Sequence, residues 1–257
     1  MAHLNVLLLA REQSAMRLHI NIDHIATLRN QRDAGYPDLV AAAKICMDAG
    51  ADGITIHLRE DRRHIRDDDV RALRQHHTGL LNLEMAATLE MTDIASQVKP
   101  DVITLVPEKR EERTTEGGLD VIRGREAVAA VAAMCHARDI KLSLFIEADE
   151  QQVRASQELG AAQVEFHTGH YCESPPAERP ALLEKLRTAA DLAASLGLQV
   201  AAGHGLNVDN VGPVARLKNI EELNIGHSVI CDAVMLGLHE AVVRLRSAIV
   251  SASSQGV

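Results

Sequence analysis

Two segments of the sequence, DAGADGITIH at residues 48–57 and ELGAAQVEFH at residues 158–167, share one pattern. In each, the end of a predicted helix meets a glycine, small residues follow, and a short strand closes on histidine. Glycine just past a helix, with a β-rich run after it, is typical of a helix-to-strand connection. Strands that alternate with helices in this way predict parallel pairing through crossover helices. The two segments therefore indicate an α/β fold.

Outward from these segments, the same alternation predicts eight strands, at residues 18–22, 53–57, 80–84, 102–106, 142–146, 163–166, 198–202 and 221–225. Helix signals lie between them, for example at residues 38–49, 120–138, 149–159 and 178–196. Eight regular units in 257 residues predict closure into a (β/α)8 TIM barrel with extra helices, in place of an open doubly wound sheet. We expect residues 1–17 to be an N-terminal extension and residues 18–257 to form a single catalytic domain.

The composition narrows the class of protein. Hydrophobic residues make up 46% of the chain but aromatic residues only 2%, so we expect a core of Ala, Val, Leu and Ile. A net charge of −9 gives no general attraction for nucleic acid. The four cysteines form no CxxC pair, which is typical of a reduced cytoplasmic protein. We also expect no interaction with a membrane.

Polar and ionisable side chains are concentrated where the predicted strands end, which is where TIM barrels carry their active sites. The residues at these positions are Asn21, Asp23, His24, His57, Arg59, Glu84, Glu165, His167, His204 and His227. Any one of them could be a solvated strand end, but packing does not explain the whole set. Imidazoles and buried carboxylates can take up and return protons near neutral pH. The pattern indicates an acid–base active site.

Two groups of residues at these strand ends are typical of phosphate sites. HLREDRRH at residues 57–64 is rich in arginine, whose guanidinium group binds phosphate oxygens bidentately, although a solvated charge run would look the same. GHG at residues 203–205 and IGH at residues 225–227 close the seventh and eighth strands, where glycine lets backbone N–H groups approach an anion. The two groups predict two phosphate pockets, with the second and fourth strands across the barrel mouth from the seventh and eighth.

Three other functions fit a barrel of this kind less well. A metal-dependent hydrolase could use the thirteen histidines, but there is no HExxH helix and no HxH at the end of the first strand, so we expect no metal. A Schiff-base aldolase needs a lysine at a strand end, and only Lys109 could reach one. A non-catalytic sugar-phosphate-binding barrel has no need of Glu84 and Glu165. These two glutamates favour an enzyme.

Several stretches are specific enough to indicate a family: NIDHIATLRNQR (21–32), DGITIHLREDRRHI (52–65), NLEMA (82–86), LVPEKREERTTEGGLD (105–120), EFHTG (165–169), AGHGLN (202–207) and LNIGH (223–227). On these motifs the chain, from about Leu18 to about Ala248, resembles the pyridoxine 5′-phosphate synthase family. The motifs occur in the order that this family has. The first residues of the chain lie outside the resemblance.

The resemblance implies condensation of 3-amino-2-oxopropyl phosphate with 1-deoxy-D-xylulose 5-phosphate to pyridoxine 5′-phosphate, phosphate and water, without a cofactor and in a homo-octamer. It implies that His57 and Glu84 are proton acceptors, that His204 is a proton donor and that Glu165 stabilises a charged intermediate. The residues that match the aminoketone phosphate site are Asn21, Arg32, Gly205, Gly226 and His227. Those that match the deoxyxylulose phosphate site are Asp23, His24, Arg59, His64 and Thr114.

Overall fold

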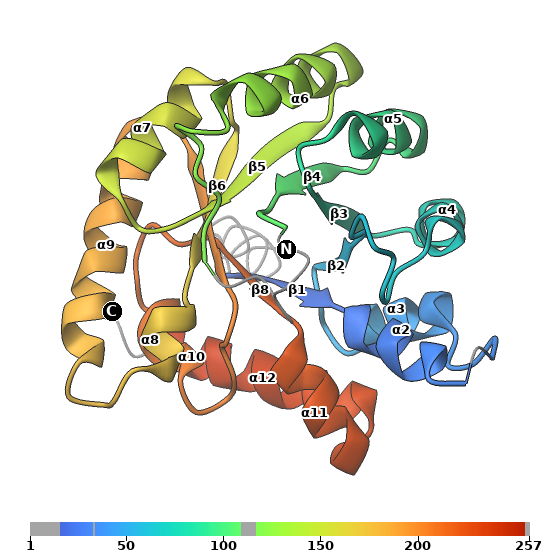
Figure 1. Cartoon of the computed structure of the whole chain (residues 1–257). Coiled ribbons are helices and arrows are strands. Elements are labelled where there is room, and N and C mark those ends of the chain that lie inside the picture. Colours follow the sequence, from blue (N-terminus) through green and yellow to red (C-terminus); the bar gives the residue numbers. More distant parts are fainter. Residues whose placement is uncertain (1–15, 33, 109–116, 255–257) are drawn as a thin grey trace, which may run out of the picture.

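The computed structural model describes residues 16–32, 34–108 and 117–254 of the chain. Its strands are β1 (Arg17–Asn21), β2 (Gly53–His57), β3 (Leu80–Met85), β4 (Val102–Leu105), β5 (Lys141–Ile146), β6 (Gln163–His167), β7 (Gln199–Gly203) and β8 (Glu222–Ile225). They pair in parallel in chain order, and β1 also pairs with β8, so the sheet closes. Figure 1 shows the strands at the centre with helices around them. The predicted TIM barrel is confirmed.

The backbone pairing explains where strand bounds differ from those predicted. β2 has the predicted bounds. β1 begins one residue early because Arg17 pairs with Glu222, and β3 continues to Met85 because that residue pairs with Leu105. The predicted extension at residues 1–17 falls mostly outside the described residues, and its last residue belongs to β1.

The helices that surround the barrel are α2 (Asp23–Asn30), α3 (Leu39–Asp48), α4 (Asp67–His76), α5 (Leu89–Val98), α6 (Arg125–Arg138), α7 (Glu150–Glu158), α8 (Gly169–Glu173), α9 (Arg179–Ser195), α10 (Val211–Ala215), α11 (His227–Leu236) and α12 (Leu238–Ser253). Two helices follow each of β1, β6 and β8, which confirms the extra helices. Side-chain caps fix two predicted starts: Asp38 accepts from the Ala41 N–H at 2.6 Å, and Asp149 accepts from the Gln151 N–H at 2.9 Å.

The predicted start of the helix at residues 120–138 is wrong, because α6 begins only at Arg125. The carboxylate of Asp120 accepts from the Arg123 N–H at 3.1 Å and from Nε2 of Gln152 at 3.2 Å. Asp120 therefore stabilises a turn that precedes the helix, a role that aspartate plays as readily as helix capping. The contact with Gln152 joins residues far apart in the chain, so the sequence pattern did not reveal it.

The molecule has an apolar layer outside the barrel and a polar layer inside it. Strand residues such as Ile54 and Ile56 are fully buried aliphatic side chains, as the composition predicted. The intervening residues face the barrel axis and bond across it, since Thr55 Oγ1 donates to Asn224 Oδ1 at 3.3 Å. Thr104 likewise donates to Asn82 at 2.9 Å. The strands therefore place polar side chains directly beneath their carboxyl ends.

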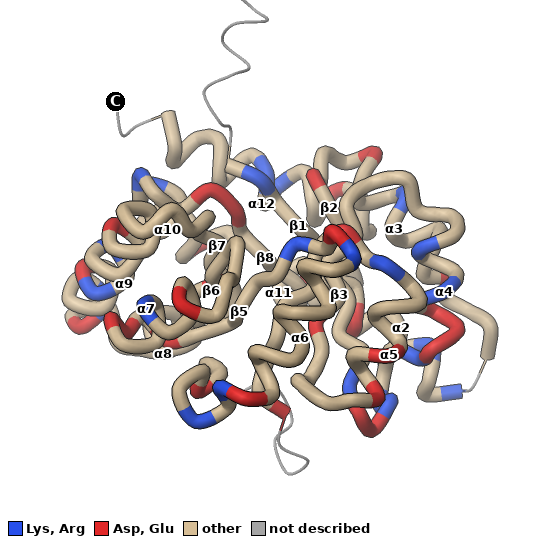
Figure 2. Tube along the Cα trace, turned by 90° about the horizontal axis from the view of Figure 1, so that it is seen from above, with Lys and Arg blue, Asp and Glu red and all other residues tan. Residues whose placement is uncertain are grey.

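Charged side chains of both signs are interspersed over the outer helices (Figure 2). Some pair at helical spacing, such as Arg154 with Glu150 at 2.8 Å and Arg187 with Asp191 at 2.6 Å. Within the described ranges, none of the helices combines the length and the apolar character that crossing a membrane requires.

Candidate active site

The carboxyl ends of the strands surround a cavity of about 470 Å³. Its lining includes most of the predicted site residues, namely Asn21, Asp23, His24, His57, Arg59, His64, Glu84, Glu165, His204, Gly205, Gly226 and His227. The barrel thus brings together residues that are distant in sequence, because they lie at or just after the carboxyl ends of six different strands.

One predicted site residue in the described part of the chain does not line this cavity. Arg32 lies just beyond α2 with an exposed side chain, and its backbone N–H donates to the Arg29 carbonyl at 3.3 Å. Thr114 lies outside the described residues, so its role stays a prediction.

His57 lies among three carboxylates. Its Nε2 is 2.9 Å from Oε1 of Glu108, and its Nδ1 is 4.0 Å from Oε2 of Glu84. Its backbone N–H donates to Oδ1 of Asp23 at 2.8 Å. With only 6% of the side chain exposed, the imidazole has little freedom to turn. A carboxylate on one ring nitrogen fixes the tautomer, so the other nitrogen can accept a proton.

Glu108 was not identified from the sequence, although it lies just past β4 in the stretch at residues 105–120. Its second oxygen accepts from the Glu60 N–H at 3.0 Å, so it links the segment after β4 to the segment after β2. Burial is the largest influence and favours the neutral form, but the hydrogen bond and charge of His57, the Glu60 N–H and Arg59 together outweigh it and hold the pKa of Glu108 below its usual value. Glu108 is therefore a carboxylate at neutral pH.

Glu84 and Glu165 are two carboxyl groups of the cavity whose pKa values are raised. Burial, and then the nearby Glu165 and Asp23, raise the pKa of Glu84 well above its usual value. Burial and then Glu222 raise the pKa of Glu165 to about 8, against the opposing hydrogen bond that Asn224 Nδ2 donates to its Oε2 at 2.7 Å. Carboxyl groups tuned upward in this way exchange protons near neutral pH.

We expect Glu165→Gln to flatten the pH dependence of stability. The folded-state pKa of Glu165 is about 8, against an ordinary 4.5, so the folded chain keeps a proton that the unfolded chain releases. The stabilising contribution of that proton is complete below the ordinary pKa and is lost as the pH rises through about 8. Urea unfolding from about pH 5 to about pH 9 should show the native chain losing a few kcal/mol relative to the variant.

A matched control is Glu126→Gln, since Glu126 is an exposed glutamate on α6. This control should keep the pH dependence of the native chain. An identical pH dependence for Glu165→Gln would show that Glu165 is ionised throughout the range.

His204 ends the turn after β7 in a left-handed backbone conformation, with φ of 80°. The hydroxyl of Thr168 donates to its carbonyl at 2.6 Å, and its ring centroid is 5.0 Å from that of His167. Burial and then His167 lower the pKa of His204 to about 4, so the imidazole is neutral in the empty cavity. An anion bound beside it would favour the protonated form.

Two glycines at the cavity have no room for a side chain. Gly205 has φ of +81°, and a Cβ atom there would lie 2.9 Å from Cβ of Cys172. A Cβ atom on Gly226 would lie 2.8 Å from Cβ of Asn21. Gly226 is also the N-cap of α11, a helix of 10 residues whose first backbone N–H groups have no partner within the helix, and Gly226, His227 and Ser228 line the cavity. This arrangement suits an anion.

Arg59 and three histidines also line the cavity, after β1, β2 and β8. Arg59 is 3% exposed, and its Nε is 3.5 Å from Oδ1 of Asp61. The ring of His64 is 6.0 Å from that of His57, and the rings of His24 and His227 are 5.0 Å apart. The site thus has cationic or imidazole groups on several sides.

The strand order corrects one detail of the predicted phosphate pockets. β2 is separated from β8 by β1 alone, so it does not lie across the barrel from β8. In a closed barrel of this order β4 lies opposite β8. The side chains after β2 and the glycines after β7 and β8 nevertheless line one cavity.

Comparison with known proteins agrees with these features. Residues 18–251 match the model of the family described as pyridoxal phosphate biosynthesis protein PdxJ. The chain belongs to this family. The match includes all eight strands, apart from Arg17 at the start of β1. It therefore includes the whole rim around the cavity.

Two relatives carry the name pyridoxine 5′-phosphate synthase. The protein from Synechococcus sp. strain JA-2-3B'a(2-13) is 56% identical over 234 residues, which is 91% of this chain and 98% of the relative. The protein from Zymomonas mobilis is 52% identical and covers 90% of each chain. Among solved structures, phosphoribosyl anthranilate isomerase from Thermus thermophilus superposes with a TM-score of 0.57 at 13% identity, covering 92% of this chain and 99% of its own. That last likeness concerns the fold alone.

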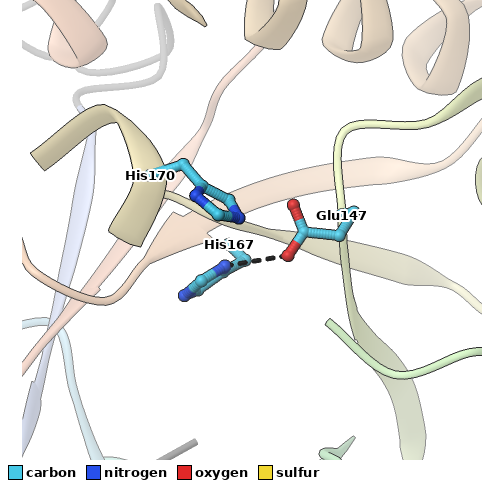
Figure 3. A group of neighbouring side chains, drawn as sticks. All are labelled: Glu147, His167 and His170. Atoms are coloured by element: carbon cyan, nitrogen blue, oxygen red, sulfur yellow. Dashed lines mark hydrogen bonds and ion pairs between the residues drawn. The ribbon is translucent and has the colours of Figure 1, made fainter. Parts of the chain in front are cut away.

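Among the described residues of this member of the PdxJ family, two clusters have donor atoms close enough to hold a metal ion. One is Asp23, His57 and Glu84 in the cavity. The other is Glu147, His167 and His170, which lie together at the ends of β5 and β6 (Figure 3). His167 was recognised in the sequence as a polar strand end, whereas Glu147 and His170 were not. Glu147 directly follows β5, the same kind of position as the residues that were recognised, whereas His170 lies in α8 beyond the end of β6.

Proposed function

We propose that the chain is a pyridoxine 5′-phosphate synthase, which condenses 3-amino-2-oxopropyl phosphate with 1-deoxy-D-xylulose 5-phosphate and releases phosphate and water. The observation that carries this proposal is the single cavity in which His57, Glu84, Glu165 and His204 meet beside candidate anion sites. Closing a pyridine ring from a ketone and an amine requires imine formation, dehydration and loss of phosphate. Each of these steps moves a proton, so several acid–base groups around one pocket are needed.

The environment of each residue supports its proposed role. His57 has one ring nitrogen bonded to Glu108 and the other facing Glu84, so it can accept a proton and pass it on. Glu84 is the second acceptor, and Glu165 stabilises a charged intermediate. His204, neutral in the empty cavity, becomes a donor when substrate phosphate favours its protonated form. The aminoketone brings its own amine, so neither a lysine nor a cofactor is required.

The two phosphate groups would occupy two parts of the cavity. We assign the aminoketone phosphate to Gly205, Gly226 and the start of α11, together with Asn21 and His227. We assign the deoxyxylulose phosphate to Arg59 and His64, with Asp23, His24 and Thr114. Arg32 belongs to the first set by family resemblance. Its side chain is exposed in the single chain, so it would reach the phosphate only in another conformation or in an assembly of several chains.

The direct test is to mix the purified chain with both substrates. We expect a pyridine chromophore and free phosphate to appear together, each dependent on both substrates. A sugar-phosphate-binding barrel without catalysis would bind one substrate and release no phosphate. If neither product appears with a folded chain, the proposed function is wrong.

Glu108 acts in this proposal as a positioning residue for His57. We expect Glu108→Gln to lower kcat roughly 10-fold or more with little change in KM, because the amide keeps the shape but not the charge that orients the imidazole. Removal of the carboxylate also disfavours the imidazolium, so the acid limb of the pH profile of kcat/KM should move to lower pH. Steady-state kinetics across pH would measure both effects.

The matched control is Glu60→Gln, an exposed neighbour that is not among the residues lining the cavity. It should leave kcat and the pH profile unchanged. Partial recovery is expected for Glu108→Asp, which restores the charge at a shorter reach. A native pH profile in Glu108→Gln would show that the contact with His57 has no catalytic consequence.

We further propose that the chain assembles as a homo-octamer, as the family resemblance implies. In support, Leu28 on α2, Tyr36 after it, and Val234 and Met235 on α11 are exposed by 61%, 81%, 75% and 83%. Large apolar side chains gathered on contacting helices are typical of an interface. Sedimentation equilibrium of the full chain would give the number of copies.

The cytoplasm is the proposed location. All four cysteines are free, and two of them, Cys46 and Cys135, are buried, as expected for a protein kept reduced. The interspersed charges of the outer helices favour neither nucleic acid nor a membrane surface as a partner.

A further inference from the structure

A second cluster of ligating side chains lies beside the active-site cavity but outside its lining. Glu147 follows β5, His167 ends β6 and His170 lies in α8, and one donor atom of each falls within 4.8 Å of the others. Figure 3 shows the carboxylate and the two imidazoles turned toward one another. We propose that these three residues bind one divalent transition-metal ion, for which Zn²⁺ is the best fit.

Two of the ligands are held in place by the surrounding structure. Oε1 of Glu147 accepts from the Gly118 N–H at 3.0 Å and is 2.9 Å from Nδ1 of His167. The His167 ring packs edge-on against Phe145 at a centroid distance of 5.3 Å, and only 6% of its side chain is exposed. Ligands fixed by neighbouring contacts lose little freedom when an ion binds.

Glycine at position 169 makes room for the His167 ring. A Cβ atom on Gly169 would lie 2.5 Å from Nε2 of His167. The same residue begins α8, which carries His170 with an exposed side chain. The rings of His167 and His170 are 5.8 Å apart. His170, together with Glu147, whose side chain is 34% exposed, therefore gives an ion from solvent a way to reach the buried His167.

The donor set selects the class of metal. Two imidazole nitrogens and one carboxylate oxygen suit Zn²⁺ and similar ions, whereas Mg²⁺ and Ca²⁺ prefer oxygen ligands alone. Among the described residues, Glu147 is paired with an imidazole and a backbone N–H and with no arginine or lysine that would compete with a cation. Three protein ligands leave the fourth position to water.

The cluster inside the cavity does not share these properties. Both carboxylate oxygens of Asp23 already accept hydrogen bonds, from the His57 N–H and from Nδ2 of Asn21. An ion there would have to break these contacts beside Arg59, which would repel it. The proposal is therefore restricted to Glu147, His167 and His170.

The test uses the full chain after removal of metal with a chelator, with Co²⁺ as a spectroscopic probe for Zn²⁺. We expect one equivalent of Co²⁺ per chain to bind with visible absorption typical of low coordination, and Zn²⁺ to displace it. His170→Ala and Glu147→Gln should each weaken Co²⁺ binding at least about 10-fold. His136→Ala, which removes an exposed histidine of α6, is the matched control and should bind Co²⁺ as the native chain does.

Three outcomes would overturn the proposal. They are the absence of saturable Co²⁺ binding, native binding in both His170→Ala and Glu147→Gln, and loss of binding in Cys231→Ser. The last would place the ion at Cys231, whose Sγ is 3.4 Å from Nε2 of His227. Because the three proposed ligands do not line the cavity, we expect the metal-free chain to keep its synthase activity, so this test and the test of the proposed function can fail separately.

Discussion

Glu84→Gln is expected to lower turnover about 100-fold or more, the scale on which a positioned general base acts. Glu84 lines the cavity, and its pKa is raised by burial and then by Glu165 and Asp23. The amide of glutamine has nearly the same size but cannot take up a proton. Substrate binding and the fold should therefore survive while the proton transfers that close the ring fail.

Single-turnover kinetics and equilibrium binding of each substrate separate these effects. We expect kcat to fall while the two dissociation constants change little, and we expect the melting temperature to stay the same or rise, since the variant no longer buries an acid. Glu126→Gln, exposed on α6, is the control for a change of charge and should turn over as the native chain does. Native turnover in Glu84→Gln would remove Glu84 from the mechanism.

The fold could be predicted because each βα unit repeats a local signal. β2 has the predicted bounds because Gly50, with φ of +100°, ends the turn after α3 and a short apolar run follows it. The start of α6 could not be predicted, since the contact between Asp120 and Gln152 converts a helix cap into a turn. A tertiary contact of this kind overrides the local preference for a helix.

The cavity could be predicted only in part, for a related reason. Residues that end strands were found because a barrel gathers strand ends at one rim, whatever their separation in sequence. Glu108 and Asn224 act through side-chain contacts with His57 and Glu165, which lie 51 and 59 positions away in the chain. No spacing rule connects such pairs. Their signal in the sequence is only that a polar residue lies in or just after a strand.

Arg59→Ala is the second large effect that we expect. It should weaken binding of 1-deoxy-D-xylulose 5-phosphate by about 2 kcal/mol, the value of a lost charge-assisted hydrogen bond. This corresponds to roughly a 30-fold rise in Kd. Binding of 3-amino-2-oxopropyl phosphate should barely change, because its proposed ligands are the backbone of Gly205 and Gly226. Calorimetric titration of each substrate alone would measure both constants.

Two further variants make the result specific. Arg59→Lys keeps the charge but not the planar fork, so it should give an intermediate loss for the sugar phosphate. Arg71→Ala removes an exposed arginine of α4 that pairs with Asp68 at 2.8 Å, and it should bind both substrates as the native chain does. If Arg71→Ala matched Arg59→Ala, the effect would be one of overall charge.

The unequal response of the two substrates is what the two-pocket proposal requires. Arg59 follows β2, whereas Gly205 and Gly226 follow β7 and β8 on the other side of β1. If the two substrates hold their phosphates at these two places, their carbon chains can meet between them. His57, Glu84 and His204 line the cavity there. A single shared anion site would instead make Arg59→Ala weaken both substrates equally. Equal losses, or a structure of the complex with one anion site, would therefore refute the two-pocket proposal while leaving the acid–base residues in place.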